Sequence, residues 1–258
     1  MRPKTRRWLR LAMIVLGIGL AAACGERGAK PKSAADMSAQ QKARMAQSYL
    51  NAGRISDSLA VLEEAIAMEP TNAALFHFRG QVYFRTGDFA QAEKAFLHAL
   101  ELDPYHTDSH NFLGAVYTEL GRPLDAEREY KIALADPAYP SPELVHLNLA
   151  LLCSGQGREE EALTNLRRSV EINPKYYQAH FELASLLDRQ GRLSEAAREY
   201  EVARPGYGES GDFHYRLGLA YFRLGEKQKA RENLLRVLDV APGSESAALA
   251  GDLLEVIQ

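Results

Sequence analysis

The stretch "FHFRGQVYFRTGDFAQAEKAFLHALELDP", residues 76–104, has the residue pattern of a helix–turn–helix. Gly87 separates its two halves, Ala92 follows five residues later, and Pro104 closes the stretch. Glycine tolerates a positive φ, so the chain can reverse after the first helix. A small residue at Ala92 lets the second helix approach the first closely. This stretch therefore predicts a pair of packed antiparallel helices.

The same pattern recurs along the chain. Turn glycines follow one another at spacings of 34, 34, 36, 34 and 34 residues, at Gly53, Gly87, Gly121, Gly157, Gly191 and Gly225. This period and these residue types resemble the tetratricopeptide repeat, a helix–turn–helix unit of about 34 residues. One unit cannot bury its own apolar face, so neighbouring units must stack. We therefore expect an all-α, right-handed solenoid of six tetratricopeptide repeats over residues 39–242, with a concave inner wall.

The last repeat needs a cover for its open apolar side, and "SESAALAGDLLEVIQ" (244–258) can supply one. Ser244 is suited to cap the start of a helix. Four apolar residues can pack back onto the sixth repeat: Leu249, Leu253, Leu254 and Ile257. Residues 243–258 are therefore predicted to form a C-terminal capping helix.

Two stretches interrupt the period. In "ADPAYPSPEL" (135–144) the prolines Pro137 and Pro140 exclude a helix, and Pro142 suits the first turn of the next one. This stretch accounts for the 36-residue step and predicts a stiff, lengthened turn on the rim of the solenoid. In "ARPGYGESG" (203–211) glycines replace the usual closing proline, which predicts a break before repeat six.

The N-terminal segment has the organisation of an export signal. Residues 1–23 carry five basic residues and no acidic ones, and their 13-residue apolar run is shorter than the roughly 20 residues of a membrane-spanning helix. Small residues directly before Cys24 predict a lipoprotein signal peptide over 1–23, with Cys24 as the lipidated residue and 24–38 as a lipidated flexible tether. An ordinary signal peptide with a free Cys24 is the alternative, and the export route, Sec or twin-arginine, is left open. Glycine instead of aspartate at Gly25 favours the periplasmic face of the outer membrane.

Composition and motifs argue against several classes of function. Without residues 1–23 the chain has 26 basic and 34 acidic residues, so we expect no nucleic-acid partner. There is no nucleophile motif, phosphate loop or metal-ligand cluster, and the repeats occupy nearly all of the mature chain. We therefore expect a protein that is not an enzyme and that binds no metal, cofactor or small-molecule substrate.

Four histidines and one cysteine could suggest chemistry, but their positions favour packing. The histidines share one position in repeats three to six: His110, His146, His180 and His214. Equivalent positions on stacked helices lie about 8–10 Å apart, which is too far for common coordination at about 2 Å. Cys153 is similarly expected to be a buried small hydrophobe and not a reactive thiol.

The remaining candidate site is the inner wall. In repeat four both faces of the first helix are apolar, with Leu147 and Leu151 on the inner stripe and Leu149 on the opposite one. A helix that is apolar all round is either fully buried or in contact with a partner. The predicted partner-binding residues are His77, Phe84, Leu147, Leu151, Phe181, Tyr215, Leu219 and Phe222. They suit an extended or helical peptide, unless the superhelix or its cap covers them.

The chain resembles the PilF/PilW/Tgl lipoproteins. The resemblance rests on four features: the cysteine motif, the six repeats, the "D-P-x-Y-P" insertion and the glycine-rich stretch before repeat six. These lipoproteins are type IV pilus pilotins, so the resemblance implies an outer-membrane lipoprotein that helps the secretin reach its membrane and assemble into a multimeric ring. The implied partners are the secretin and, through the lipid, the membrane. A general periplasmic repeat scaffold that docks cell-envelope enzymes is the alternative function.

Overall fold

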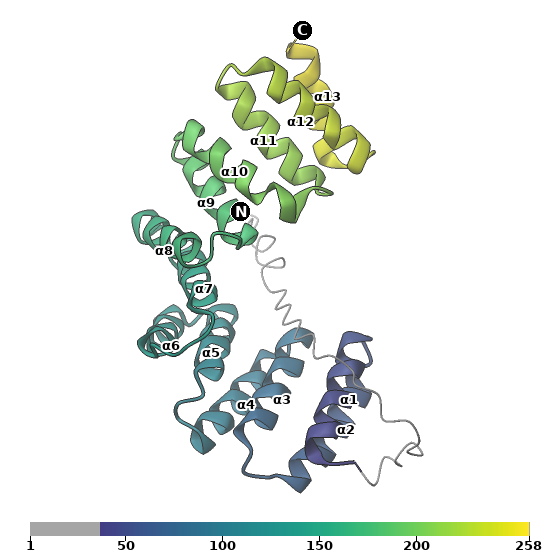
Figure 1. Ribbon diagram of the computed structural model, residues 1–258, viewed down its shortest axis with the longest axis vertical. Coiled ribbons are helices and arrows are strands. Elements are labelled where there is room, and N and C mark those ends of the chain that lie inside the picture. Colours follow the sequence, from purple (N-terminus) through teal and green to yellow (C-terminus); the bar gives the residue numbers. More distant parts are fainter. Residues whose placement is uncertain (1–36, 258) are drawn as a thin grey trace, which may run out of the picture. The chain divides into compact units, whose positions relative to one another are not determined.

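The computed structural model describes residues 37–257, and these form thirteen α-helices and no strand (Figure 1). The signal peptide, Cys24 and nearly all of the predicted tether lie outside the described residues. The helices are α1 (Ala39–Asn51), α2 (Ile55–Met68), α3 (Ala73–Thr86), α4 (Phe89–Leu102), α5 (Thr107–Glu119), α6 (Pro123–Ala135), α7 (Pro142–Gly155), α8 (Glu159–Ile172), α9 (Tyr177–Arg189), α10 (Leu193–Tyr207), α11 (Gly211–Arg223), α12 (Lys227–Val240) and α13 (Glu245–Val256). None of these helices is long and apolar enough to span a bilayer.

The first twelve helices pair as six hairpins. Each odd-numbered helix packs on the even-numbered helix that follows it, and that helix packs on the next hairpin. The odd-numbered helices α3 and α5 also contact one another, as do α5 and α7. Helices α6 and α8 lie on the outer side of their hairpins in Figure 1. The prediction of an all-α solenoid of tandem repeats is confirmed.

The turn glycines have the conformation that the repeat requires. All six adopt a left-handed backbone, with φ between 70° and 79°. After Gly87, the amide of Asp88 donates to the carbonyl of Tyr83 at 3.0 Å, which closes the end of α3. The reversal of each hairpin is therefore encoded locally by its glycine.

A second set of glycines was not anticipated from the sequence. Gly80 and Gly114 lie inside helices, and each packs directly against an aromatic ring of the partner helix. A Cβ on Gly114 would lie 2.6 Å from the Cε1 atom of Tyr130, whose side chain is fully buried, and Gly80 faces Phe96 in the same way. These glycines allow a large ring to fill the space between the two helices of the hairpin.

The substitution Gly114→Ala is therefore expected to destabilise the fold by about 1–3 kcal/mol, because the new methyl group overpacks against Tyr130. Gly155→Ala is the matched control, since Gly155 is also helical and has nothing within 4 Å of its would-be Cβ. The control should be neutral or slightly stabilising. Urea unfolding of both variants measures the difference, and equal midpoints would show that the close contact at Gly114 is not a constraint.

The proline-rich insertion is more than a rim turn. As expected, α6 ends at Ala135 and α7 begins with Pro142 in its first turn. The side chain of Tyr139, however, is buried, and its hydroxyl donates to Asp108 Oδ1 at 2.9 Å. Asp136 accepts a further hydrogen bond from Thr107 at 2.6 Å. Two side chains thus tie the insertion to the start of α5.

The predicted break before repeat six lies at residues 208–210, within the 203–211 stretch. Helix α10 continues through Pro205 and ends only at Tyr207. The Tyr207 ring stacks on Phe181, with ring centroids 4.7 Å apart, and on Phe213, at 5.6 Å. These stacking contacts stabilise the additional turn and offset the backbone hydrogen bond that proline cannot make.

The final helix covers the sixth hairpin, as predicted for the cap. The Ser244 hydroxyl accepts a hydrogen bond from the amide of Ala247 at 3.1 Å, and α13 packs on α11 and α12. Ile257 is buried, and Leu253 and Leu254 are partly buried against the same core. The prediction for Leu249 was wrong, because this residue faces outward and is 43% exposed.

Candidate protein-binding surface

The eight predicted partner-binding residues all lie on odd-numbered helices, but they are not equally accessible. His77 and Leu147 are buried in the interior, at 8% and 2% exposure. The other six are partly exposed: Phe84, Leu151, Phe181, Tyr215, Leu219 and Phe222. The binding role of these residues stays a prediction, and His77 and Leu147 do not contribute to an accessible surface in the free protein.

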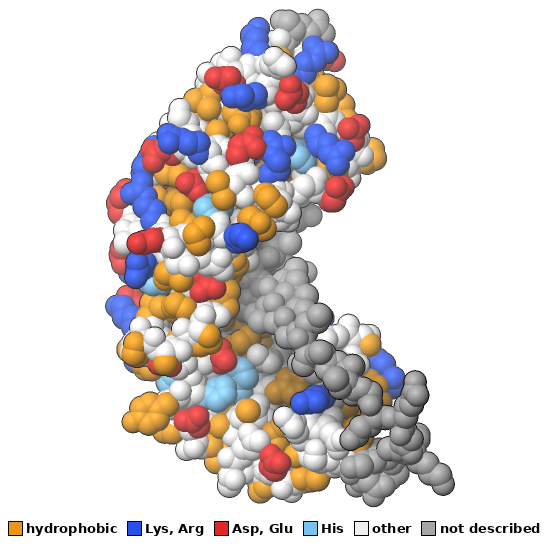
Figure 2. Space-filling view, viewed as in Figure 1, with side chains coloured by type: hydrophobic (Ala, Val, Ile, Leu, Met, Phe, Trp, Pro, Cys, Tyr) orange, Lys and Arg blue, Asp and Glu red, His pale blue; other side chains and the backbone are white. Residues whose placement is uncertain are grey.

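His77 belongs to a buried polar network. Its Nδ1 atom lies 2.9 Å from the hydroxyl of Ser109, which lies 3.0 Å from Nδ1 of His106. The rings of Phe96 and Phe112 are within 5.4 Å of the His77 ring, centroid to centroid. Burial, assisted by the neighbouring His106, lowers the pKa of His77 to about 3. Figure 2 shows histidine side chains gathered over the region of α4 and α5.

This low pKa predicts a loss of stability in mild acid. His77 stays neutral in the fold, whereas in the unfolded chain it takes up a proton as the pH falls below about 6.5. Protonation of the unfolded chain therefore favours unfolding between pH 6.5 and 3. When the pH falls from 7 to 5, His77 should lower the free energy of unfolding of the wild type by about 2 kcal/mol. Urea unfolding at both pH values should show a smaller loss for His77→Gln. Equal losses in the two proteins would contradict the buried, neutral state.

Helix α7 is apolar all round because it packs on two cores. Leu149 is buried on one side with residues of α5 and α6, whereas Leu147 is buried on the other with residues of α8 and α9. Leu151 packs on this second core but remains partly exposed. Most of the helix is therefore explained by packing, and Leu151 marks the part of it that a partner can reach.

We use the name inner apolar surface for five partly exposed residues on α7, α9 and α11: Leu151, Phe181, Tyr215, Leu219 and Phe222. All but Leu219 pack against one common core. The stacking of Phe181 on Tyr207 fixes the position of its ring. In Figure 2 apolar side chains are exposed along the region of α7 and α9. Phe84 lies apart, on α3, in contact with Phe89 and Phe112.

Charged residues border this surface and pair with one another across the repeats. The guanidinium of Arg223 on α11 donates to Asp188 on α9, and Arg189 donates to the hydroxyl of Ser154 on α7 at 3.0 Å. Arg216 pairs with Asp212 at 2.8 Å within α11. An apolar centre with a polar border is the arrangement found at protein interfaces.

The four recurrent histidines are structural, as predicted. Each bonds through Nδ1 to a side chain 19 residues further on, in the partner helix: His110 to Glu129 at 2.7 Å, His146 to Asn165 at 3.0 Å, His180 to Glu199 at 2.6 Å and His214 to Asn233 at 3.4 Å. The described part of the chain contains no cluster of three potential metal ligands. Cys153 is buried, and burial raises its pKa, so the thiol is packed as expected.

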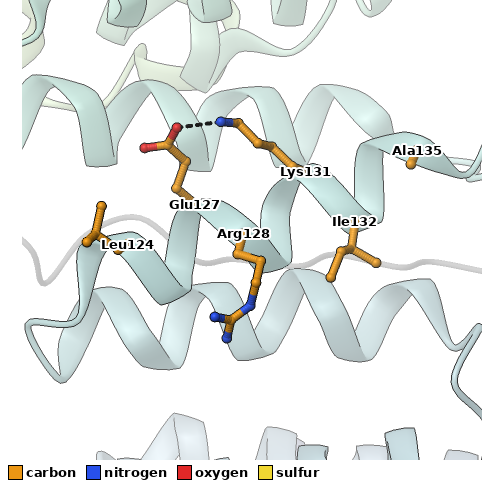
Figure 3. A pocket seen from close by; sticks show the side chains of 6 residues that line it. All are labelled: Leu124, Glu127, Arg128, Lys131, Ile132 and Ala135. Carbon is orange, nitrogen blue, oxygen red and sulfur yellow. Dashed lines mark hydrogen bonds and ion pairs between the residues drawn. The ribbon is translucent and has the colours of Figure 1, made fainter.

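Figure 3 shows a pocket on the outer face of α6 with a volume of about 480 Å³. It is lined by Leu124, Glu127, Arg128, Lys131, Ile132 and Ala135. Glu127 and Lys131 form an ion pair at 2.7 Å, and Leu124 is 81% exposed. A single helix supplies every lining residue, so the pocket is a shallow hollow along one helix face and is not enclosed by a second element. It does not have the enclosure typical of a small-molecule site.

Comparison with known families agrees with this architecture. A tetratricopeptide repeat model matches residues 44–107, 79–141, 113–176 and 147–210, and a second model of the same repeat matches 211–244. The chain therefore belongs to the tetratricopeptide repeat proteins. This repeat fold typically serves as a scaffold for protein–protein interaction, and no enzyme family is indicated. No curated protein matches the chain in sequence.

Solved structures give a finer comparison. The chain is similar to PilW, described as a widely conserved type IV pilus biogenesis factor, with 25% identity and a TM-score of 0.73 over 82% of this chain and 97% of that one. It has the fold of PilF from Pseudomonas aeruginosa, with 19% identity, a TM-score of 0.74 and coverage of 85% and 97%. It also shares the fold of YrrB, described as having an unusual peptide-binding site, with 22% identity, a TM-score of 0.57 and coverage of 74% and 97%.

Proposed function

We propose that this protein is a pilotin-like lipoprotein that binds the type IV pilus secretin and assists its assembly at the periplasmic face of the outer membrane. The observation that carries the proposal is the similarity to the pilus biogenesis factor PilW, which extends over 97% of that protein. The inner apolar surface supports it, because a non-catalytic scaffold needs an accessible apolar area to hold a partner. In this proposal the repeats bind the secretin, and the N-terminal lipid keeps the complex at the membrane.

Co-purification and secretin assembly test this function together. The tagged full chain, extracted from membranes in mild detergent, should retain the secretin, and deletion of its gene should abolish heat-resistant secretin multimers. A cell that assembles normal multimers without the protein would refute the pilotin role. If the tagged chain retains cell-wall enzymes and no secretin, the general periplasmic scaffold is the better description.

The anchor can be tested at Cys24, which lies outside the described residues. Cys24→Ser is expected to prevent lipidation, because serine lacks the thiol that becomes acylated. The variant should incorporate no radiolabelled palmitate, and it should either leave the membrane fraction or remain unprocessed. A Cys153→Ser variant is the control, since that thiol is buried and should not affect palmitate incorporation. Membrane attachment without lipid in wild type and variant alike would exclude the proposed anchor.

A further inference from the structure

Glu182 on α9 differs from the other acidic residues that border the inner apolar surface. It follows Phe181 directly in the sequence and is partly buried, and its carboxylate forms no ion pair with a side chain of residues 37–257. Burial is the main influence on this group and raises the pKa of Glu182. Because partial burial disfavours the charged form of a carboxylate that has no ion pair, a cation brought next to this group would be stabilising.

The nearest cations do not supply this partner. Arg216 and Arg189 lower the pKa of Glu182, but by less than burial raises it. Arg216 forms its ion pair with Asp212 at 2.8 Å, and Arg189 reaches Ser154 at 3.0 Å and Glu159 at 3.8 Å.

The third arginine of this region, Arg223, is paired with Asp188. Each of the three arginines thus contacts a different carboxylate, and Glu182 is the one that remains without an ion pair in this part of the fold.

The aromatic residues beside Glu182 suit the stem of a long basic side chain. Phe181 and Tyr215 are partly exposed on adjacent helices, and the Arg216 guanidinium carbon already lies 5.9 Å from the centre of the Phe181 ring. The Tyr207 ring stacks on Phe181, with ring centroids 4.7 Å apart. Lysine and arginine pack their aliphatic stems on such surfaces while their charged ends meet a carboxylate.

We infer that the inner apolar surface binds a segment of a protein partner that carries a lysine or arginine among apolar residues, and that Glu182 accepts this cation. The inference rests on the proposed function, since it names the chemistry of the partner for the same surface. The apolar residues of the segment would cover Leu151, Leu219 and Phe222. The basic residue would fix the register of the segment by pairing with Glu182.

The test uses the full chain, purified in detergent, and a library of random 12-residue peptides displayed on phage. Wild-type protein is expected to select peptides with a lysine or arginine at one fixed position between apolar residues. Glu182→Gln, which keeps the size of the side chain and removes its charge, should select peptides without this preference. Fluorescence anisotropy with a labelled wild-type-selected peptide should show binding that is at least tenfold weaker for Glu182→Gln. Glu160→Gln, at an exposed position of α8, is the matched control and should bind like wild type.

The outcomes separate the role of Glu182 from the inner apolar surface on which the proposed function depends. Selected peptides with no basic residue in common, or unchanged binding to Glu182→Gln, would overturn the role of Glu182 while leaving the surface in place. Phe222→Arg, checked for folding by circular dichroism, should lose all of these ligands. If wild type selects no peptides, or if they still bind Phe222→Arg, the surface itself is wrong and the inference fails with it.

Discussion

Leu151→Arg is expected to leave the fold intact and to abolish heat-resistant secretin multimers. Leu151 is partly exposed on α7, so an arginine there can extend its charged end into solvent. The same cation would oppose an apolar partner segment at the α7 end of the inner apolar surface. Loss of an apolar anchor residue commonly costs 2 kcal/mol or more of binding free energy, which is about thirtyfold in affinity. A secretin immunoblot without prior boiling measures the multimers, and circular dichroism measures the fold.

Leu149→Arg is the control that separates binding from folding. Leu149 lies two residues away on the same helix, but it is buried against α5 and α6. An arginine there would place an unpaired charge in the core and should destabilise the protein by about 3 kcal/mol or more. The two variants should thus both lack multimers but differ in melting temperature. If Leu151→Arg melts as early as Leu149→Arg, position 151 is core and the proposed surface is wrong.

The features that could be predicted from the sequence are those that a few neighbouring residues determine. A turn glycine such as Gly87 ends its helix through its own backbone conformation, so its recurrence predicted the hairpins and their order. The cap at Ser244 depends on an amide three residues away. The structural role of the recurrent histidines followed from their spacing alone, although their partners 19 residues on were not anticipated.

The features that were missed depend on contacts between distant residues. His77 was assigned to the accessible wall, but it is covered by side chains of the next repeat, including Ser109 and Phe112. Leu147 was placed on the same wall for its helical position, and the core shared with α8 and α9 buries it. Glu182 was not recognised, because the sequence does not show which carboxylates Arg189, Arg216 and Arg223 pair with in the fold.

The insertion between repeats three and four provides a second large expected effect. Tyr139 is buried among residues of α5 and α7, including Leu113, Val145 and Leu149, and its hydroxyl bonds Asp108. Tyr139→Ala should therefore destabilise the protein by about 3 kcal/mol, as the loss of a buried aromatic side chain commonly does. Tyr139→Phe should cost only about 1 kcal/mol, because it removes the hydrogen bond and keeps the ring. Urea unfolding of the purified variants measures both changes.

The preceding inter-repeat turn offers a matched control, since Tyr105 is 90% exposed there. Tyr105→Ala should change stability by no more than about 0.5 kcal/mol, because it removes the same side chain from a site without burial. A loss at Tyr139 that exceeds this value would show that the insertion is part of the core and fixes the start of α7 against α5. The inner apolar surface begins on α7, so removing two residues from the insertion should also weaken secretin assembly, through a displaced α7. Equal stability of Tyr139→Ala and Tyr105→Ala would instead show that the insertion is an independent rim loop.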